Sequence, residues 1–337
     1  MGWKTIMLQD KNTDIRLSQI DNWLKSQFSL TSFHFELASS DASFRRYFRV
    51  TANDKTWILM DAPPEQEDTN PFTKVASFLF QHGINVPEIV AKDKDLGLLL
   101  LTDFGSTAYL DRLNSHSVDA LYRSAINSLI DIQLIKSNDI ELADYDEALL
   151  QQEMDLFPNW FLDRHFGITS PPFLQQTFDA LIKNAIEQPQ VIVHRDYHSR
   201  NLMHTNDNSP GIIDFQDAVI GPISYDLVSL LRDCYISWPQ QKLNEFIGYY
   251  LSRSQAKGLL LGLSTEQFTR WFDLMGLQRH IKVLGIFCRL NYRDNKPNYI
   301  NDLPLTLNYV KQVSAKYPEF SQLHHFLSEH PVIGAIK

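Results

Sequence analysis

In the segment VIVHRDYHSRNLMH, residues 191–204, the eight positions 194–201 hold two histidines, two arginines, one aspartate and one asparagine between two short apolar runs. Thirteen residues after Asn201, a second carboxylate stands at Asp214 in the apolar stretch GIIDF. The carboxylate of Asp214 and the amide oxygen of Asn201 are ligands that suit a hard cation such as Mg²⁺. A separate carboxylate at Asp196 can accept or orient the proton of an attacking hydroxyl. Together these residue types fit phosphoryl transfer, in which metal ions neutralise a crowded terminal phosphate.

The apolar runs around these residues predict three short strands, VIVH, NLMH and GIIDF, which would bring the polar side chains together. His194, Asp196 and Asn201 form the pattern H-x-D-x-x-x-x-N, and the letters HRD are those of the protein-kinase catalytic loop. The alternative is a surface loop followed by an unrelated aspartate at a strand end. A lone H-x-D is a weak pattern. Its combination with flanking strands and with IIDF at hairpin distance is restrictive, and it favours a catalytic site.

The first hundred residues have the pattern of a mostly antiparallel sheet with one helix. Three short segments rich in aromatic and β-branched residues predict strands: FHFELASS (33–40), FRRYFRVTA (44–52) and KTWILMDAPP (55–64). The segment NPFTKVASFLFQHG predicts a helix with Asn70 at the N-cap, Pro71 in the first turn and Gly83 at its end. The segment VPEIVAKDKDLGLLLLTD then predicts two further strands around a charged turn.

From about residue 106 the pattern changes to long helical segments, which we expect near 116–136, 144–166, 171–187, 239–256 and 264–293, with shorter helices near the C-terminus. The chain is therefore expected to be an α+β protein with two lobes. We place a sheet lobe with one helix at residues 1–102 and a mainly helical lobe, which carries the catalytic segment, at residues 103–337.

Composition narrows the class of protein. The chain has 337 residues, of which 44% are hydrophobic, so it can bury a large core. Two cysteines do not make a disulfide framework, and the N-terminal residues lack the layout of a signal peptide. The net charge of -9 disfavours nucleic-acid binding, and no apolar run is long enough to cross a bilayer. We expect a cytoplasmic protein that binds neither nucleic acid nor membrane.

The motifs VHRDYHSRN and IIDFQDAVIGPISYDLVSLLRD, in a chain that runs from sheet to helices, resemble the aminoglycoside phosphotransferase and choline kinase family, which has the protein-kinase-like bilobal fold. Longer segments are similar to one branch, the bacterial anomeric N-acetylmuramate/N-acetylglucosamine kinases of cell-wall recycling. These segments are SSDASFRRYFRV, MDAPPEQED, LLLLTDFG and WFDLMGLQRHIKVLGIFCRLNYRDNKPNYINDLPL. The resemblance runs from about residue 35 to about residue 310.

The resemblance implies a role for each residue of the motif. It makes Asp196 the catalytic base, Asn201 and Asp214 the ligands of Mg²⁺, and ATP the phosphoryl donor. His194 would support the catalytic loop. Asp226, in GPISYDL, would brace the same loop by accepting its backbone N–H groups. Asp226 could also cap the helix YDLVSLLRDCY, and both roles can hold at once.

The sequence departs from the kinase pattern where a lysine of the third strand normally grips the phosphates. Met60 stands near that position, and the next helix contains no glutamate to pair with such a lysine. Arg46 shares a strand face with apolar residues, and its planar guanidinium suits phosphate; Lys74 is a second candidate. Alternatively, Arg45, Arg46 and Arg49 form ion pairs within the protein.

Two further segments of the sheet lobe are candidates for nucleotide binding. Residues 39–43, SSDAS, replace a Gly-rich loop with small residues whose backbone N–H groups, including that of Ser43, could cover the phosphates. The run LLLLTD would be the hinge between the lobes, with the backbone from Leu101 to Asp103 meeting the adenine edge. Its alternative is an ordinary buried strand.

The helical lobe must select the acceptor. Four cations of LQRHIKVLGIFCRLNYRDN fall within an arc of about 80° on a helix: Arg279, Lys282, Arg289 and Arg293. They could pair with carboxylates of the same protein, or Arg279 and Arg289 could form a cationic patch for an acidic sugar. The segment FPNWFLDRHFG adds Trp160, which could stack on a sugar ring, and Arg164; aromatic residues at this spacing also fit a core.

We therefore expect an ATP- and Mg²⁺-dependent kinase that phosphorylates the anomeric hydroxyl of N-acetylmuramate or N-acetylglucosamine in peptidoglycan recycling. One alternative is another small-molecule kinase of the family, with an aminoglycoside, choline or a related alcohol as acceptor. A second alternative is a nucleotide-binding pseudokinase, suggested by Met60 and the missing helix glutamate. The expected partner is a small-molecule sugar, and no obligate protein partner is implied.

Overall fold

The structure is a computed structural model that describes residues 15–28, 33–40 and 44–336. The chain divides into two compact units. The first contains the chain up to Ser77 together with Pro87–Phe104, and the second contains Phe78–Val86 together with Gly105–Lys337. Among the described residues, no helix is both long enough and apolar enough to cross a membrane.

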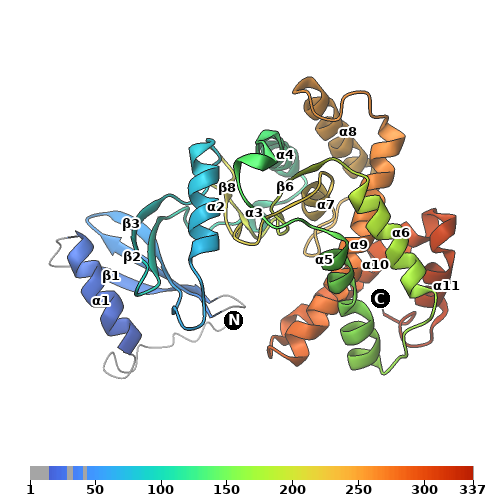
Figure 1. Ribbon diagram of the computed structural model, residues 1–337, viewed down its shortest axis with the longest axis horizontal. Coiled ribbons are helices and arrows are strands. Elements are labelled where there is room, and N and C mark those ends of the chain that lie inside the picture. The colour runs from blue at the N-terminus through green and yellow to red at the C-terminus, as the bar shows by residue number, and fades with distance from the viewer. Residues whose placement is uncertain (1–14, 29–32, 41–43, 337) are drawn as a thin grey trace. The chain divides into compact units, whose positions relative to one another are not determined.

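The first unit is built on a five-stranded antiparallel sheet in the order β1-β2-β3-β5-β4, which confirms the predicted sheet (Figure 1). Its strands are β1 (His34–Ser40), β2 (Arg46–Ala52), β3 (Lys55–Asp61), β4 (Ile89–Asp93) and β5 (Leu98–Thr102). The β2–β3 hairpin pairs Arg46 with Asp61 and Ala52 with Lys55. The predicted helix is α2 (Asn70–Gln81), and it begins with Asn70 itself, so the N-cap position lies one residue earlier than predicted.

A helix that the sequence pattern did not predict, α1 (Ile15–Phe28), covers part of this sheet (Figure 1). Its Ile20, Trp23 and Leu24 recur at helical spacing and are buried against strand residues that include Phe35 and Phe48. The rest of α1 is largely polar, so its apolar stripe is narrow. The tertiary contact with the sheet therefore stabilises this helix more than its own sequence pattern does.

The side chain of Asp61, at the end of β3, is completely buried and binds two arginines. Arg46 donates from Nε and Nη2 to Oδ2, at 2.9 and 2.6 Å. Arg16 of α1 donates to Oδ1, from Nε at 3.1 Å and also from Nη2. A buried carboxylate is stable only when its charge is matched and its oxygens accept hydrogen bonds. Asp61 thus ties α1 and β2 to the end of β3.

The second unit consists of helices around two short antiparallel strand pairs (Figure 1). The strands are β6 (Gln190–Val193), which pairs with β9 (Val219–Pro222), and β7 (Leu202–Met203), which pairs with β8 (Gly211–Ile212). The α-helices are α3 (Tyr109–Arg112), α4 (Val118–Leu134), α5 (Glu147–Met154), α6 (Leu174–Ile186), α7 (Tyr225–Leu231), α8 (Gln240–Ala256), α9 (Thr265–Tyr292), α10 (Leu303–Lys316) and α11 (Ser321–Glu329). The 3₁₀ helices are η1 (Ser137–Asp139), η3 (Pro297–Asp302) and η4 (Pro318–Phe320).

The segment predicted as one helix over 144–166 is divided in the structure. It consists of α5 and a separate π-helix, η2 (Phe157–His165), with Pro158 in its first turn. Proline lacks the N–H that would continue the α-helical hydrogen bonds, which gives a physical reason for the break. The wider turn of a π-helix also shifts the direction in which Trp160 and Arg164 project relative to an α-helix.

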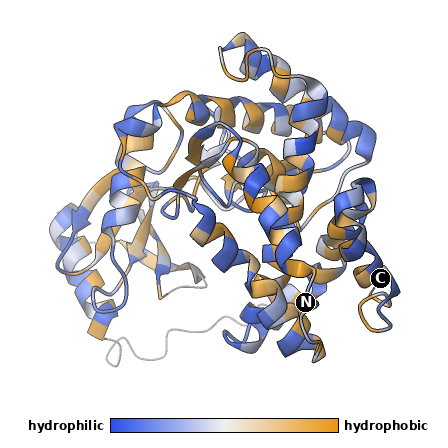
Figure 2. Cartoon of the chain, turned by 45° about the vertical axis from the view of Figure 1, so that its right-hand side comes forward, coloured by the Kyte–Doolittle hydropathy of each residue, from blue (hydrophilic) through white to orange (hydrophobic). Residues whose placement is uncertain are grey.

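The 28-residue helix α9 forms the centre of the second unit, where it packs against α5, α6, α7, α8, α10 and η2. Gly285 allows α9 to approach the backbone just before η2 closely, because a Cβ atom there would lie 2.3 Å from the backbone carbon of Leu156. Figure 2 shows hydrophobic and hydrophilic residues on different sides of many helices, as expected for amphipathic helices that bury one face.

The Asp61 cluster gives a testable prediction for stability. Replacing Asp61 with Asn removes the charge that two arginines share, and we expect the free energy of unfolding to fall by about 3 kcal/mol. Urea denaturation followed by circular dichroism would measure the change. The matched control is Asp95→Asn, an exposed aspartate in the same unit, which should change stability by less than about 0.5 kcal/mol. Equal unfolding curves for the two variants would contradict the role given to Asp61.

Candidate active site

The predicted catalytic residues lie in two loops of the second unit, one between β6 and β7 and one between β8 and β9. Pairing of β6 with β9 and of β7 with β8 brings the two loops together at the strand ends. Arg195 and Asp214 have φ angles of 73° and 67°. This left-handed region is uncommon for residues other than glycine, and it occurs where the surrounding structure holds a functional backbone in place.

Asn201 connects the backbone of Asp196 to the carboxylate of Asp214. Its Nδ2 donates to the backbone oxygen of Asp196 at 3.1 Å and to Oδ2 of Asp214 at 3.2 Å. The other carboxylate oxygen of Asp214 accepts a hydrogen bond from Nε2 of Gln216 at 2.8 Å. Both bonds of Asn201 use its amide nitrogen, so the amide oxygen is the atom suited to a cation. The structure thus brings Asp196, Asn201 and Asp214 together.

Asp226 and His194 hold the loop that carries Asp196. The two carboxylate oxygens of Asp226 accept the backbone N–H groups of His194 and Arg195, at 2.6 and 3.0 Å. Asp226 lies in the first turn of α7, where Ser224 occupies the N-cap position, so its described bonds brace the loop and do not cap the helix. His194 joins the two loops, because its Nε2 contacts the backbone oxygen of Ile213 at 3.0 Å. Burial raises the pKa of the Asp226 carboxyl to about 6.

A second buried carboxylate, which the sequence pattern did not reveal, supports the other end of the same loop. Asp233 accepts hydrogen bonds from the backbone N–H and the hydroxyl of Ser199, at 3.0 and 2.5 Å. It also accepts the backbone N–H of Tyr235 at 3.0 Å. Asp233 follows α7 by two residues, so the short segment 224–233 supplies both braces. In the sequence, Asp233 is the last residue of the motif IIDFQDAVIGPISYDLVSLLRD, but no role was predicted for it.

Glu153 of α5 is the centre of a buried charge network beside the loop. Its carboxylate pairs with Arg195, accepts a hydrogen bond from the Tyr145 hydroxyl, and lies 2.8 Å from Nζ of Lys282. Burial acts to raise the pKa of Glu153, but the charges of Lys282 and Arg195 outweigh it and lower the pKa. Glu153 therefore stays ionised and fixes the arginine that precedes Asp196. Nothing in the local sequence around Glu153 indicated this role.

The surroundings of Asp196 favour its charged form. Burial acts to raise the pKa of the Asp196 carboxyl, but the charges of His198 and Lys282, followed by that of Arg279, lower it below its usual value. His198 is half-buried, and its ring packs edge-on against Tyr235 with the centroids 5.5 Å apart. An ionised carboxylate in a partly enclosed site can orient a hydroxyl and accept its proton.

The four predicted cations, three in α9 and Arg293 directly after its last residue, have different partners. Lys282 pairs with Glu153, and Arg293 pairs with Asp294 at 2.7 Å. Within the described part of the chain, no ion pair joins Arg279 or Arg289 to a carboxylate, and the Nε atoms of both are buried without a hydrogen-bond partner. Arg279 is only 4% exposed. Two of the four cations are thus internal ion pairs, while Arg279 and Arg289 retain donors for another anion.

The two predicted residues of η2 differ in their surroundings. Trp160 is half-buried, and Arg164 is exposed with its guanidinium 5.3 Å from the centre of the Tyr292 ring. The latter contact joins the π-helix to the C-terminal end of α9. The structure shows no direct contact of either side chain with Asp196 among the described interactions.

The predicted nucleotide-binding residues belong to the first unit. Arg46 binds Asp61, as described above, and Asp103 forms an ion pair with Arg49 at 2.7 Å. The hydrogen bond and charge of Asp103 raise the pKa of Arg49 against the effect of its burial. Leu101 is buried in the inner strand β5, where it pairs with β3 and β4. Ser43 lies outside the described residues.

Comparisons with known proteins agree with this arrangement. A sequence model described as the phosphotransferase enzyme family matches residues 34–260. An N-acetylmuramate/N-acetylglucosamine kinase from Pseudomonas putida is 41% identical over 330 residues, which cover 94% of this chain and 97% of the relative. A protein of the same name from Pseudomonas aeruginosa is 44% identical over 298 residues, which cover 87% of this chain and 88% of the relative.

Solved structures that resemble the whole chain have the same fold at low sequence identity. An ethanolamine kinase from Plasmodium vivax has a TM-score of 0.63 at 12% identity, covering 95% of this chain and 93% of its own. An aminoglycoside phosphotransferase with bound ADP has a TM-score of 0.57 at 15% identity, covering 88% of this chain and 98% of its own. These likenesses confirm the protein-kinase-like fold predicted from the sequence.

The family match extends over about two thirds of the chain and includes both loops that carry Asp196, Asn201 and Asp214. The relatives above 40% identity extend the similarity to nearly the full length. This chain belongs to the phosphotransferase enzyme family, and it is an ATP-dependent phosphotransferase.

Proposed function

We propose that the protein transfers the γ-phosphoryl group of ATP to the anomeric hydroxyl of N-acetylmuramate or N-acetylglucosamine, a reaction of cell-wall recycling. The observation that carries the proposal is the convergence of Asp196, Asn201 and Asp214 in a chain that is 41–44% identical to kinases named for these two sugars. The acceptor is therefore a small molecule, and the reactive group is an alcohol.

Asp196 is proposed to act as the catalytic base. Its lowered pKa keeps the carboxylate charged at neutral pH, so it can orient the sugar hydroxyl and accept its proton as the new O–P bond forms. Asp226 and Asp233 hold the loop around Asp196 through backbone N–H groups. They act as positioning residues, since their carboxylates are occupied by these bonds.

Asn201 and Asp214 are the residues proposed to hold Mg²⁺. Two protein oxygen ligands suit this cation, which keeps several waters and binds phosphate oxygens in the remaining positions. When bound, Mg²⁺ neutralises the negative charge that develops on the transferred group. The hydrogen bonds from Asn201 and Gln216 fix the orientation of the Asp214 carboxylate that would hold the cation.

Arg279 and Arg289 are proposed to favour an acidic sugar. Their Nε atoms are buried and lack hydrogen-bond partners in the described structure, and the charge of Arg279 acts on Asp196. N-acetylmuramate carries a lactyl carboxylate, whereas N-acetylglucosamine is neutral. A polycationic aminoglycoside would meet repulsion from the same arginines, so their presence argues against that acceptor class.

The proposed reaction takes place in the cytoplasm. This proposal is supported by the two cysteines, Cys234 and Cys288, which are buried and unpaired, as in proteins of a reducing compartment.

A panel of acceptors tests the proposed function. ADP release from ATP should depend on N-acetylmuramate or N-acetylglucosamine, should require Mg²⁺, and should yield the sugar 1-phosphate. Choline, ethanolamine and an aminoglycoside serve as competing acceptors in the same assay. Turnover of one of these without turnover of either amino sugar would overturn the proposal, and nucleotide binding without turnover of any acceptor would favour a pseudokinase.

The role of Asp196 can be tested with Asp196→Asn. This variant keeps the shape of the side chain but cannot accept a proton, so we expect kcat to fall by about 10²–10⁴-fold with little change in the KM for ATP. Steady-state kinetics would measure both constants. The control is Asp207→Asn, in an exposed loop of the same unit, which should retain the parent kcat. An unchanged kcat in the Asp196 variant would reject the assigned base.

Arg289→Gln tests recognition of the acidic sugar. Loss of a charge-assisted hydrogen bond should raise the KM for N-acetylmuramate by about tenfold, while the KM for the neutral N-acetylglucosamine changes little. Arg293→Gln is the matched control, because Arg293 is on the same helical face but already pairs with Asp294. An equal change in the KM for both sugars in Arg289→Gln would show that this arginine does not bind the carboxylate of N-acetylmuramate.

A further inference from the structure

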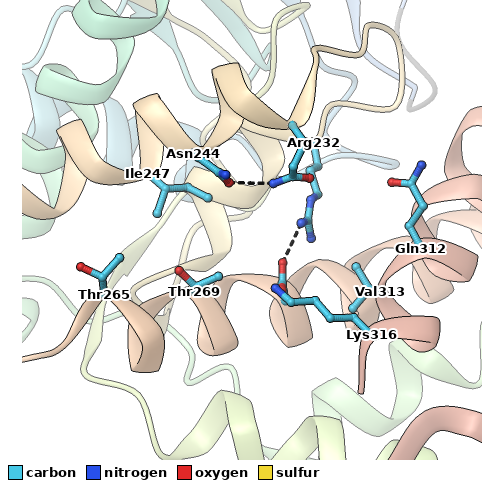
Figure 3. A pocket seen from close by; sticks show the side chains of 10 residues that line it. Arg232, Asn244, Ile247, Thr265, Thr269, Gln312, Val313 and Lys316 are labelled. Carbon is cyan, nitrogen blue, oxygen red and sulfur yellow. Dashed lines mark hydrogen bonds and ion pairs between the residues drawn. The ribbon is translucent and has the colours of Figure 1, made fainter. Parts of the chain in front are cut away.

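A polar cavity of about 530 Å³ lies between helices of the second unit and shares no residue with the proposed active site (Figure 3). Its volume is within the range of small-molecule sites. Gln240 and Asn244 come from α8, Thr265 and Thr269 from α9, and Gln312 and Lys316 from α10. Most of the lining side chains therefore carry hydrogen-bonding groups, which suits a hydrophilic ligand.

Three charged residues define one wall of this cavity. Arg232, which is 6% exposed, donates from Nη2 to Oδ1 of Asp273 at 2.6 Å. The other oxygen of Asp273 accepts hydrogen bonds from Lys316 at 2.5 Å and from the Tyr317 hydroxyl at 2.7 Å. Two cations thus share one carboxylate. The cavity wall carries a net positive charge in a chain whose overall charge is -9.

The donors of Arg232 are only partly used. Its bond to Asp273 occupies one nitrogen, and Nη1 is buried without a hydrogen-bond partner in the described structure. This nitrogen lies against Gly276 of α9, where an added Cβ atom would be 3.2 Å away, so it is the positive charge of Arg232 and not its Nη1 donor that favours an anion in the cavity. The guanidinium also lies over the Phe272 ring, 4.8 Å from its centre, and this contact limits its rotation.

The backbone around Arg232 is fixed in place. Its carbonyl oxygen contacts Nε2 of His280 at 2.9 Å, and the following residue, Asp233, binds Ser199 of the catalytic loop. Burial lowers the pKa of His280 to about 3, so His280 is neutral and adds no charge. A charged group held by such contacts loses little entropy when a ligand binds, which favours affinity.

We propose that this cavity is a second ligand site, which binds a small hydroxylated anion such as a sugar phosphate or a sugar acid. Arg232 and Lys316 face the anionic group, and the amides and threonine hydroxyls of the other walls bond to the hydroxyl groups. The site is separate from the one that holds the acceptor, and the inference does not depend on which acceptor the enzyme phosphorylates.

Gln312→Glu tests this site while the buried ion pair of Arg232 with Asp273 stays in place. Removing Arg232 would leave the buried Asp273 short of a partner and could prevent folding. Gln312 is exposed, and a glutamate there stands four residues before Lys316, a spacing that stabilises a helix. The new carboxylate places a negative charge in the cavity and repels an anion. Gln322→Glu, on the exposed face of α11 and outside the cavity, is the matched control.

The measurement is isothermal titration with N-acetylglucosamine 1-phosphate in the presence of a saturating non-hydrolysable ATP analogue, Mg²⁺ and N-acetylglucosamine, which block the catalytic site. The parent protein and Gln322→Glu should bind one molecule per chain, and Gln312→Glu should bind about tenfold more weakly. Glucuronate in a second titration distinguishes a carboxylate from a phosphate ligand, and neutral glucose should not bind.

Two results would overturn the inference. One is no binding of either anion to the parent protein, and the other is equal affinity in the parent protein and Gln312→Glu. The acceptor assay described above tests the proposed function independently, so a failure of the second site can be told apart from a failure of the proposed reaction. An enzyme that does not phosphorylate amino sugars would still bind the anion in a manner sensitive to residue 312.

Discussion

The catalytic segment keeps its shape because two buried carboxylates accept its backbone N–H groups. Asp226 holds the residues before Asp196, and Asp233 holds Ser199 a few positions later. These bonds fix a backbone that includes Arg195 in the left-handed region. The support of the loop around Asp196 thus comes from one short buried segment after β9, which fixes the position of this side chain.

The charge at the site depends on helices that are distant in sequence. Glu153 of α5 pairs with both Arg195 and Lys282, and the charge of Lys282 in turn lowers the pKa of Asp196. Each buried charge in this group is stable only because its partner is present. The helix α9 supplies Lys282 and Arg279 from one buried face, so the element that organises the core also acts on the charge state of Asp196.

Local patterns predicted much of this structure. Alternation of apolar and polar residues predicted β2 and β3, because burial with a period of two residues is visible in sequence. Short apolar runs around the HRD segment predicted the strands that carry the two loops. The nearness of Asp196, Asn201 and Asp214 followed from their spacing. The partners Glu153 and Asp233 could not be predicted in this way, since their roles arise from contacts across 42 and 34 residues.

Other features differed from the local pattern for identifiable reasons. Helix α1 has too narrow an apolar stripe to be recognised without the sheet that it covers. The π-helix η2 has the composition of an α-helix, and only Pro158 marks the change. Ion pairs of Arg46 and Arg49 were among the alternatives in the sequence, but periodicity cannot decide which carboxylate an arginine binds.

The region that the family model matches is shorter than the part of the chain that the fold requires. The matched region, residues 34–260, excludes α1 at one end and α9 to α11 at the other. In a fragment that ends at these limits, Asp61 would lose Arg16, one of its two arginine partners. Glu153 would lose Lys282. The smallest part of the chain that can fold and act by itself is thus larger than the region that the family model matches. Residues 34–260 expressed alone should lack contacts that stabilise the folded enzyme.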